Sequence, residues 1–391
     1  MKPDSIHTAL IGYVFLLLMM PIGGVAQANS PSAAEIRAYM DQAQRDLRDN
    51  QPDAAIKAYQ AVLRLDPNSV DAHADLGVVA MSTGNWSAAS EQLDAALKIQ
   101  PSNSQVQALL GLCDIRLGRT EEAERLLSDA FPMLHDPKLK REAGLTLVEI
   151  EFETGELEKA SAFLLPLEAS APGDAAISYA AFRVYSELTF RSIQSLAINA
   201  PNSPQLHRAL AEHMVNDGRT EAAIIEYRKA LAITPDSFDL HYELGQALIA
   251  ESHQESNLAE AQKEFESSIR LKPGSARCEC QLAEVETLRS NPAGASSHFA
   301  QALKLDPDAA CAKAGLASQL IDEGKNQQAL DYLQAAVRSD PYDAQIHYHL
   351  ATLYRQMGNK DAAAKEMETF KELRDVADEM KRALHPDSEH N

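Results

Sequence analysis

Apolar residues recur at helical spacing in two blocks of the stretch 204–235, with a short polar break between them. In the first block Leu206, Leu210 and Met214 stand four positions apart, which places them on one face of a helix. The break at residues 216–219 contains a glycine, which favours the end of one helix and the start of another. A proline closes the second block, because it has no amide hydrogen to continue a helix. The stretch therefore predicts one helix–turn–helix unit.

This unit recurs along the chain with a fixed period. The closing prolines stand 34 residues apart in four pairs: Pro67 and Pro101, Pro201 and Pro235, Pro273 and Pro307, and Pro307 and Pro341. The second helix of each unit carries an alanine followed four positions later by a large apolar residue: Ala55 and Tyr59, Ala89 and Leu93, Ala123 and Leu127, Ala160 and Leu164, Ala223 and Tyr227, Ala295 and Phe299, Ala329 and Leu333, and Ala363 and Met367. Leu-Gly pairs mark the first helix at Leu76-Gly77, Leu110-Gly111 and Leu244-Gly245.

With this period and these small and large positions, the sequence resembles the tetratricopeptide repeat (TPR) family. The resemblance covers nearly all of the chain after the N-terminal segment. It implies an all-α fold, a right-handed superhelical solenoid of about nine to ten helix–turn–helix repeats in which each repeat contacts its neighbours. Glycine or alanine at the small positions lets neighbouring helices approach closely, and the large residue fills the gap between them.

The repeat pattern divides the chain into segments. They are a signal peptide or membrane anchor at 1–28, an N-terminal array at 36–172, an irregular helical repeat at 173–203, a C-terminal array at 204–377, and a capping helix end with a disordered tail at 378–391. The irregular segment has helical spacing but no glycine turn, so it is either a shortened repeat or a pair of helices. In the repeat at 238–275, we expect the extra residues around 251–260 to lengthen the turn.

The N-terminal segment has the features of a secretory signal. An uninterrupted apolar run from Ala9 to Met20 is short for a membrane span, which needs about 20 residues. Small residues at Ala26 and Ala28 form a cleavage signal, so we expect cleavage after Ala28 and a periplasmic or secreted protein. The alternative is that residues 9–28 stay uncleaved and anchor the chain in a membrane.

Charge and motifs exclude several classes of function. The chain has 36 basic and 57 acidic residues, a net charge of −21, and no basic stripe, so nucleic acid is not expected as a partner. The phosphate-binding, nucleophile and zinc-protease motifs are absent from the sequence, and no small-molecule substrate is evident. We therefore expect no enzyme activity, no cofactor and no metal.

A histidine recurs at one position of the first helix, at His73, His207, His241 and His347. Imidazole is a common metal ligand, but these rings lie one to a repeat. We expect them to pack between helices, where the family usually has an aromatic residue, and a metal site is the alternative.

Two of the four cysteines are separated by nearly one repeat. Cys280 and Cys311 lie 31 residues apart, three fewer than the period. The stagger of neighbouring first helices in the TPR family implies that this offset brings the side chains together. We therefore consider a disulfide there, against two independent free thiols.

The resemblance also implies a binding site, because TPR proteins commonly hold a partner peptide in the concave groove formed by their first helices. The candidate groove residues are Val78, Met81, Leu109, Leu112, Ile115, Leu145, Phe152, Arg208, Tyr242, Gln246 and Tyr348. The N-terminal ones are apolar and are either groove or inter-helix core, whereas the C-terminal ones are more polar.

These features favour a non-catalytic scaffold that binds a protein or peptide partner outside the cytoplasm. The alternative is a membrane-anchored accessory subunit of an envelope-assembly or secretion system.

Overall fold

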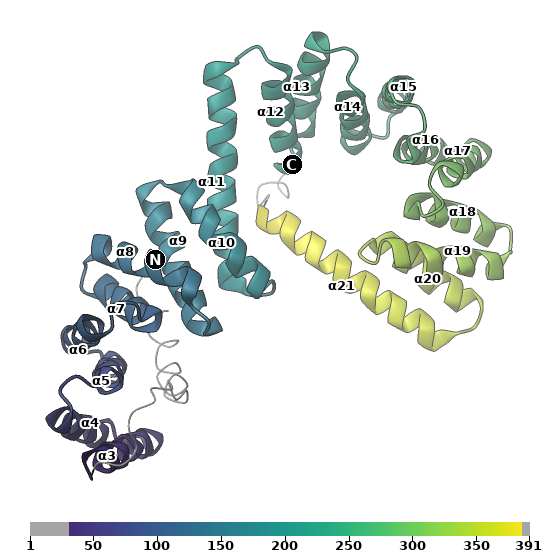
Figure 1. The fold of residues 1–391 in the computed structure, drawn as a ribbon. Helices are drawn as coiled ribbons and strands as arrows, with labels where there is room; N and C mark the ends of the chain where they lie inside the picture. Colours follow the sequence, from purple (N-terminus) through teal and green to yellow (C-terminus); the bar gives the residue numbers. More distant parts are fainter. Residues whose placement is uncertain (1–30, 385–391) are drawn as a thin grey trace. The chain divides into compact units, whose positions relative to one another are not determined.

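The computed structural model describes residues 31–384, and the signal or anchor segment and the last seven residues lie outside this range. Within the described residues the fold contains 19 α-helices, one short 3-10 turn and no strands. The chain divides into two compact units between Phe190 and Arg191. Figure 1 shows each unit as a row of antiparallel helix pairs. The prediction of an all-α repeat fold is confirmed.

The first unit contains four helix pairs and a linking 3-10 turn. They are α3 (Pro31–Arg48) and α4 (Pro52–Leu65), α5 (Val70–Ser82) and α6 (Trp86–Ile99), α7 (Ser104–Arg116) and α8 (Thr120–Ala130), η2 (Phe131–Met133), and α9 (Pro137–Thr154) and α10 (Leu157–Ser170). Each helix contacts its pair partner, and α6 contacts α7 of the following pair, so packing is local in sequence.

The second unit contains five helix pairs. They are α12 (Pro204–Asn216) and α13 (Thr220–Ile233), α14 (Phe238–Glu251) and α15 (Glu255–Leu271), α16 (Ala276–Leu288) and α17 (Pro292–Leu305), α18 (Ala310–Asp322) and α19 (Asn326–Ser339), and α20 (Ala344–Gln356) and α21 (Lys360–Leu384). First helices of successive pairs also touch, as α14 touches α16 and α18 touches α20.

Local sequence signals set the helix ends. The Ser203 side chain accepts a hydrogen bond from the Leu206 amide and caps α12, which satisfies one of the free amides at a helix start. Gly218 has a φ of 70°, a left-handed conformation that costs glycine little, and it turns the chain between α12 and α13. Comparable caps and glycine turns recur in most pairs. The helix ends could therefore be predicted from the sequence.

Arginine–carboxylate pairs link successive repeats. The shortest distances are 2.5 Å for Arg141–Asp174, 2.6 Å for Arg183–Glu149, 2.5 Å for Arg208–Glu243, 2.8 Å for Arg228–Glu260, 2.8 Å for Arg277–Asp239 and 2.8 Å for Arg289–Glu255. Partners lie 32 to 38 residues apart, close to one period. These pairs fix the position of one repeat against the next, although exposed ion pairs add only about 0.2–1 kcal/mol each.

The irregular segment differs from both alternatives that its sequence allowed. It forms one unbroken helix, α11 (Ala175–Asn199), of 25 residues, and the boundary between the two units falls inside it. No glycine or proline interrupts residues 175–199, so nothing in this stretch ends a helix. A shortened repeat or a helix pair is therefore absent here.

The insertion in the repeat at 238–275 also differs from expectation. Only residues 252–254 separate α14 from α15, as three residues separate α12 from α13. Most of the extra length lies in α15, which has 17 residues where α13 has 14, and α14 is one residue longer than α12. The inserted residues contain no glycine or proline, so they extend the second helix and leave the turn short.

Among the described residues, no helix is both long enough and apolar enough to cross a membrane.

Candidate functional site

The apolar groove residues predicted in α5 and α7 are buried. Val78, Met81, Leu109 and Leu112 are 5–9% exposed and belong to the core cluster of the first unit. Each of these helices packs against its own pair partner and against a neighbouring pair, so more than one of its faces is covered. Of the two alternatives for these four residues, groove or inter-helix core, their burial favours inter-helix packing.

The other three apolar candidates of the first unit are partly buried. Leu145 and Phe152 pack against the same core cluster, and Ile115 is also only partly exposed. The Arg183 guanidinium lies 4.2 Å from the centre of the Phe152 ring and pairs with Glu149 at 2.6 Å. Phe152 is therefore covered by a cation–π contact from α11.

In the second unit the predicted polar candidates reach the surface. Arg208 on α12 forms ion pairs with Glu212 on its own helix at 2.9 Å and with Glu243 on α14 at 2.5 Å. Burial raises the pKa of Glu243, and the positive charge of Arg208 offsets part of this rise. The pair thus connects two neighbouring first helices at the edge of solvent.

An arginine stacked on two aromatic rings lies one repeat further on. The Arg277 guanidinium of α16 is 4.3 Å from the Tyr242 ring centre and 4.8 Å from the Phe238 ring centre. It also pairs with Asp239 at 2.8 Å. Its side chain is 51% exposed, so a charged group held in a fixed orientation faces solvent.

We use the term first-helix face for the exposed side chains that recur on the first helices of the second unit. They are Glu212, Gln246, Arg277, Glu284, Tyr348 and Arg355. Gln246 and Tyr348 were predicted, and the Tyr348 ring is 42% exposed while it packs 5.3 Å from the ring of Phe370. At 100° per residue, the four others lie on the same face of these helices as Gln246 and Tyr348, so the helical period places them there too.

The structure joins Cys280 and Cys311 in a disulfide, with their Cα atoms 6.2 Å apart. Cys280 on α16 is buried, whereas Cys311 on α18 is exposed. The bond links two consecutive first helices. The remaining thiols, Cys113 and Cys278, are free and buried.

The recurrent histidines make hydrogen bonds inside the repeats. In His347 one ring nitrogen, Nδ1, lies 2.7 Å from Glu366 on the second helix, and the other, Nε2, lies 3.0 Å from the Pro341 carbonyl. His241 contacts Glu264 and Pro235 in the same way, and His73 contacts Gln92 and Pro67. His207 contacts Glu226 at 2.7 Å.

Each ring therefore ties a first helix to its second helix, and three of them also reach the proline turn. No group of three metal-ligating side chains occurs in residues 31–384.

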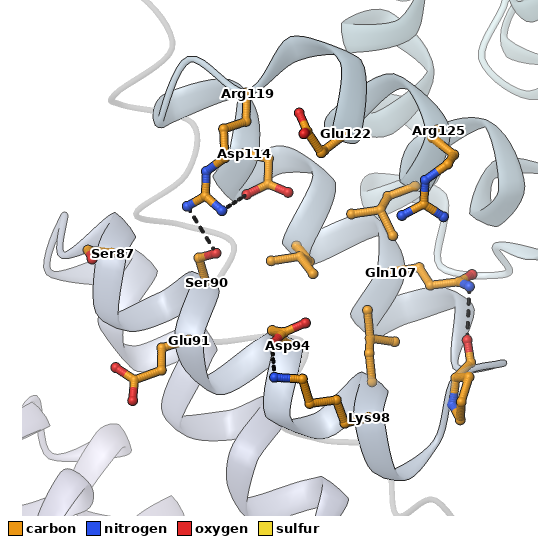
Figure 2. A pocket seen from close by; sticks show the side chains of 14 residues that line it. Ser87, Ser90, Glu91, Asp94, Lys98, Gln107, Asp114, Arg119, Glu122 and Arg125 are labelled. Atoms are coloured by element: carbon orange, nitrogen blue, oxygen red, sulfur yellow. Dashed lines mark hydrogen bonds and ion pairs between the residues drawn. The ribbon is translucent and has the colours of Figure 1, made fainter.

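An open pocket that the sequence did not reveal lies between two consecutive repeats of the first unit. It has a volume of about 670 Å³, and Figure 2 shows the side chains of α6, α7 and α8 around it. Its charged lining is mixed, with Glu91, Asp94, Asp114 and Glu122 beside Lys98, Arg119 and Arg125. Carboxylates and basic groups alternate there, so the lining does not define one class of ligand.

Asp114 is the most buried charged group in this pocket, at 3% exposure. Burial raises its pKa, and Arg119, whose guanidinium lies 3.3 Å from the carboxylate, offsets part of the rise. Arg119 also donates a hydrogen bond to Ser90 of the preceding repeat (Figure 2). These contacts tie α7 and α8 to α6, which is a structural role.

Models of the tetratricopeptide repeat match four segments of the chain, residues 46–113, 215–250, 280–343 and 320–383. They cover, wholly or in large part, the helices α4 to α7, α13, α14 and α16 to α21. The chain is a tetratricopeptide repeat protein.

A curated relative is the peroxisomal targeting signal receptor of Candida albicans. It is 28% identical over 207 residues, which make up 50% of this chain and 35% of that protein. The chain thus matches only about a third of the length of that relative.

Among solved structures, the Cut9–Hcn1 hetero-tetramer of APC/C shares 12% identity, covers 90% of each chain and has a TM-score of 0.46. YrrB, described as a TPR protein with an unusual peptide-binding site, shares 19% identity over 46% of this chain and 91% of its own, with a TM-score of 0.34. At these identities the likeness concerns the fold alone.

Proposed function

We propose that this protein is a non-catalytic scaffold that binds a protein or peptide partner on the first-helix face of its second unit. The observation that carries the proposal is the recurrence of exposed polar, charged and aromatic side chains on four of the five first helices of the second unit, α12, α14, α16 and α20. Tyrosine and arginine are the residue types that contribute most to protein interfaces. Here they project from helices held rigidly by their neighbours, so little side-chain ordering opposes binding.

The fixed positions of these side chains support recognition of an extended partner. Arg277 is oriented by two aromatic rings and one carboxylate, and Tyr348 by the ring of Phe370. The groups project from α12, α14, α16 and α20, with two each on α16 and α20, so a partner chain that runs along the face meets several contacts. Recognition by such a face requires no reacting groups, which is consistent with a scaffold.

The experiment compares two variants with the same change of composition. The first, Gln246→Ala with Tyr348→Ala, removes two side chains from the first-helix face. The control, Gln327→Ala with Tyr342→Ala, removes an exposed glutamine from the second helix α19 and a tyrosine that is 80% exposed in the turn before α20. A partner recovered with the native chain from an extracytoplasmic extract is then purified and titrated against all three proteins.

We expect the first variant to bind at least about tenfold more weakly and the control to bind like the native chain, because two interface anchors are lost. Equal binding by both variants would exclude the first-helix face. Recovery of no partner at all would contradict the scaffold function.

The proposal includes a location outside the cytoplasm, supported by the apolar run Ala9–Met20 and the small residues at Ala26 and Ala28. N-terminal sequencing of the protein isolated from its host tests this location. A start at Asn29 supports a cleaved periplasmic or secreted form. An intact Met1 in the membrane fraction would favour the alternative of an anchored accessory subunit, for which the same apolar run is the specific observation.

A further inference from the structure

Helix α11 carries apolar side chains on two opposite faces. On one face Ile177, Ala181 and Val184 are 0–5% exposed and belong to the core of the first unit. At 100° per residue, Tyr179, Phe182 and Phe190 fall within roughly 80° of one another on the opposite face. A helix that is apolar on two faces has the pattern of an element packed on both sides.

The second face is open to solvent. Tyr179 is 52% exposed, and Phe182 and Phe190 are each 60% exposed. We call these three residues and the intervening Ser186 the α11 stripe. Large aromatic side chains that line up on one exposed helix face usually mark a protein interface.

The spacing of the α11 stripe is symmetric about Ser186. Phe182 precedes Ser186 by four residues and Phe190 follows it by four. Tyr179 precedes it by seven and Ile193 follows it by seven. The apolar positions, though not the residue types at the outer two, are thus the same when the helix is reversed end to end. A two-fold axis through Ser186 would therefore place Phe182 of one helix against Phe190 of a reversed copy.

We propose that two copies of this chain associate through their α11 stripes, antiparallel, with Ser186 on the two-fold axis. Two-fold pairs use the same patch on both subunits, which requires a self-complementary surface such as this one. The small serine at the centre lets the two helices approach, and the phenylalanines on either side fill the space. The stripe itself carries no charge, so the acidic net charge of the chain is not concentrated at the contact.

The size of the stripe sets the strength of the dimer. Each aromatic side chain has about 150–250 Å² of surface, of which roughly half is exposed here. Three such side chains on each of two copies supply about 600 Å², below the roughly 1,200 Å² of a standard stable interface. The dimer is therefore weak and reversible, with a dissociation constant on the order of 10–100 μM.

Sedimentation equilibrium of the full chain over a range of concentrations tests the association. We expect a concentration-dependent dimer that is lost in the Phe182→Glu, Phe190→Glu double variant. The matched control, Tyr342→Glu, changes a more exposed aromatic residue away from α11 and should dimerise like the native chain. Because all three positions are exposed, circular dichroism should show unchanged helix content in every variant.

Single cysteines test the register. Under mild oxidation, Ser186→Cys should cross-link two copies, whereas Ser178→Cys, exposed on the same helix but outside the stripe, should not. An equimolar mixture of Phe182→Cys and Phe190→Cys chains should give mainly mixed dimers, as antiparallel pairing requires.

Three results would overturn the proposal. One is a monomer at all concentrations up to about ten times the expected dissociation constant. Another is a dimer that persists in the double glutamate variant. The third is like-with-like cross-linking in the mixture, which would mean parallel helices. If the chain stays monomeric and the stripe variants lose binding to a different protein, the occupant is a foreign partner and not a second copy.

Discussion

Gly245 and Phe265 meet where the two helices of the α14–α15 pair approach most closely. A Cβ atom built on Gly245 would lie 2.6 Å from Cε1 of the Phe265 ring and within 2.9 Å of two further ring carbons. Phe265 is fully buried, so its ring has little room to move. Because Gly245 has no Cβ atom, the Phe265 ring can pack directly against the backbone of α14 in the core of the repeat.

We expect Gly245→Ala to destabilise the second unit by up to about 2 kcal/mol. Alanine gains about 1 kcal/mol of helix propensity over glycine, but overpacking a filled core costs about 1–3 kcal/mol. Urea unfolding followed by circular dichroism measures the difference. Gly173→Ala is the control, because no atom lies within 4 Å of its new Cβ. A destabilisation of equal size in both variants would contradict the packing argument.

The pH dependence of stability should contain a contribution from Asp75. Burial raises the pKa of Asp75 to about 7, the Tyr59 hydroxyl offsets part of the rise, and the charge of Asp71 adds to it. In the unfolded chain this carboxyl has its ordinary pKa near 4. The folded state therefore binds the proton more tightly, and the first unit loses stability as pH rises from about 4 to about 7.

Asp75→Asn, which is neutral at every pH, should remove this loss. We expect the variant to match the native chain at pH 4 and to be more stable at pH 8, by on the order of 4 kcal/mol, since the pKa is raised by about three units and one unit corresponds to about 1.4 kcal/mol. Thermal melts at both pH values compare the two proteins. A difference between them that does not change with pH would argue against ionisation of Asp75 as the cause.

The contribution of Asp174 to stability has the opposite pH dependence. Arg141, hydrogen-bonded to it at 2.5 Å, lowers its pKa to about 2, and the amides of Ala176 and Ile177 at the start of α11 contribute. A carboxyl with a lowered pKa stabilises the fold above its unfolded pKa near 4, and this contribution is lost as pH falls through about 2.

Two substitutions separate the roles of Asp174. Asp174→Asn keeps an oxygen for the α11 cap but loses the ion pair, and should cost about 0.5–1 kcal/mol at pH 7. Asp174→Ala loses both and should cost about 2 kcal/mol. Chemical unfolding at pH 7 and at pH 2.5 gives the two values. Equal costs for both substitutions would mean that the side chain does not cap the helix.

Replacing His347 by phenylalanine tests the histidine contacts. The ring volume is nearly kept, but Glu366 and the Pro341 carbonyl lose their partner. Because His347 is only 6% exposed, we expect a loss of about 1–3 kcal/mol in the free energy of unfolding. His213→Phe is the matched control, since that ring is 53% exposed and lies 3.5 Å from Asp217. If the His347→Phe variant is as stable as the native chain, the His347 ring stabilises the fold only by filling space and not by its hydrogen bonds.

Peptide mapping under non-reducing conditions tests the cysteine arrangement. We expect one linked pair of peptides containing Cys280 and Cys311, and two peptides with Cys113 and Cys278 that react with an alkylating reagent only after unfolding, because both thiols are buried. Alkylation of all four cysteines in the native protein from its host would rule out the disulfide in that environment. A Cys280→Ser, Cys311→Ser variant gives the reference for the reduced state.

The sequence predicts this fold well because every repeat packs its two helices with the same types of residue at the same positions. The alanine of the second helix and the large residue four positions later are buried in most repeats, as Ala89 and Leu93 are. Caps and turns depend on local residue types, so they too could be read along the chain. The features that differed, the continuous α11 and the lengthened α15, depend on the absence of a stop signal, which a periodic pattern does not report.

The site was harder to predict than the fold. Val78 and Leu112 occupy first-helix positions that are exposed in the polar repeats, such as that of Gln246. An apolar residue at such a position can line an open surface or be covered by neighbouring helices. Which of the two occurs depends on how those helices pack, and the residue type at the position does not determine it. The pocket beside Asp114 is similar, because its lining comes from two repeats and has no motif of its own.

The disulfide between neighbouring first helices has a mechanical consequence. If the chain is pulled from its two ends, force travels through the covalent bond between Cys280 and Cys311 and bypasses the 31-residue separation between them. Helix α17 and its flanking turns would then bear no load. The oxidised chain should extend about 10 nm less than the reduced chain when fully stretched, since each residue spans about 3.5 Å. One repeat of the second unit is thus shielded from tension that would unravel its neighbours.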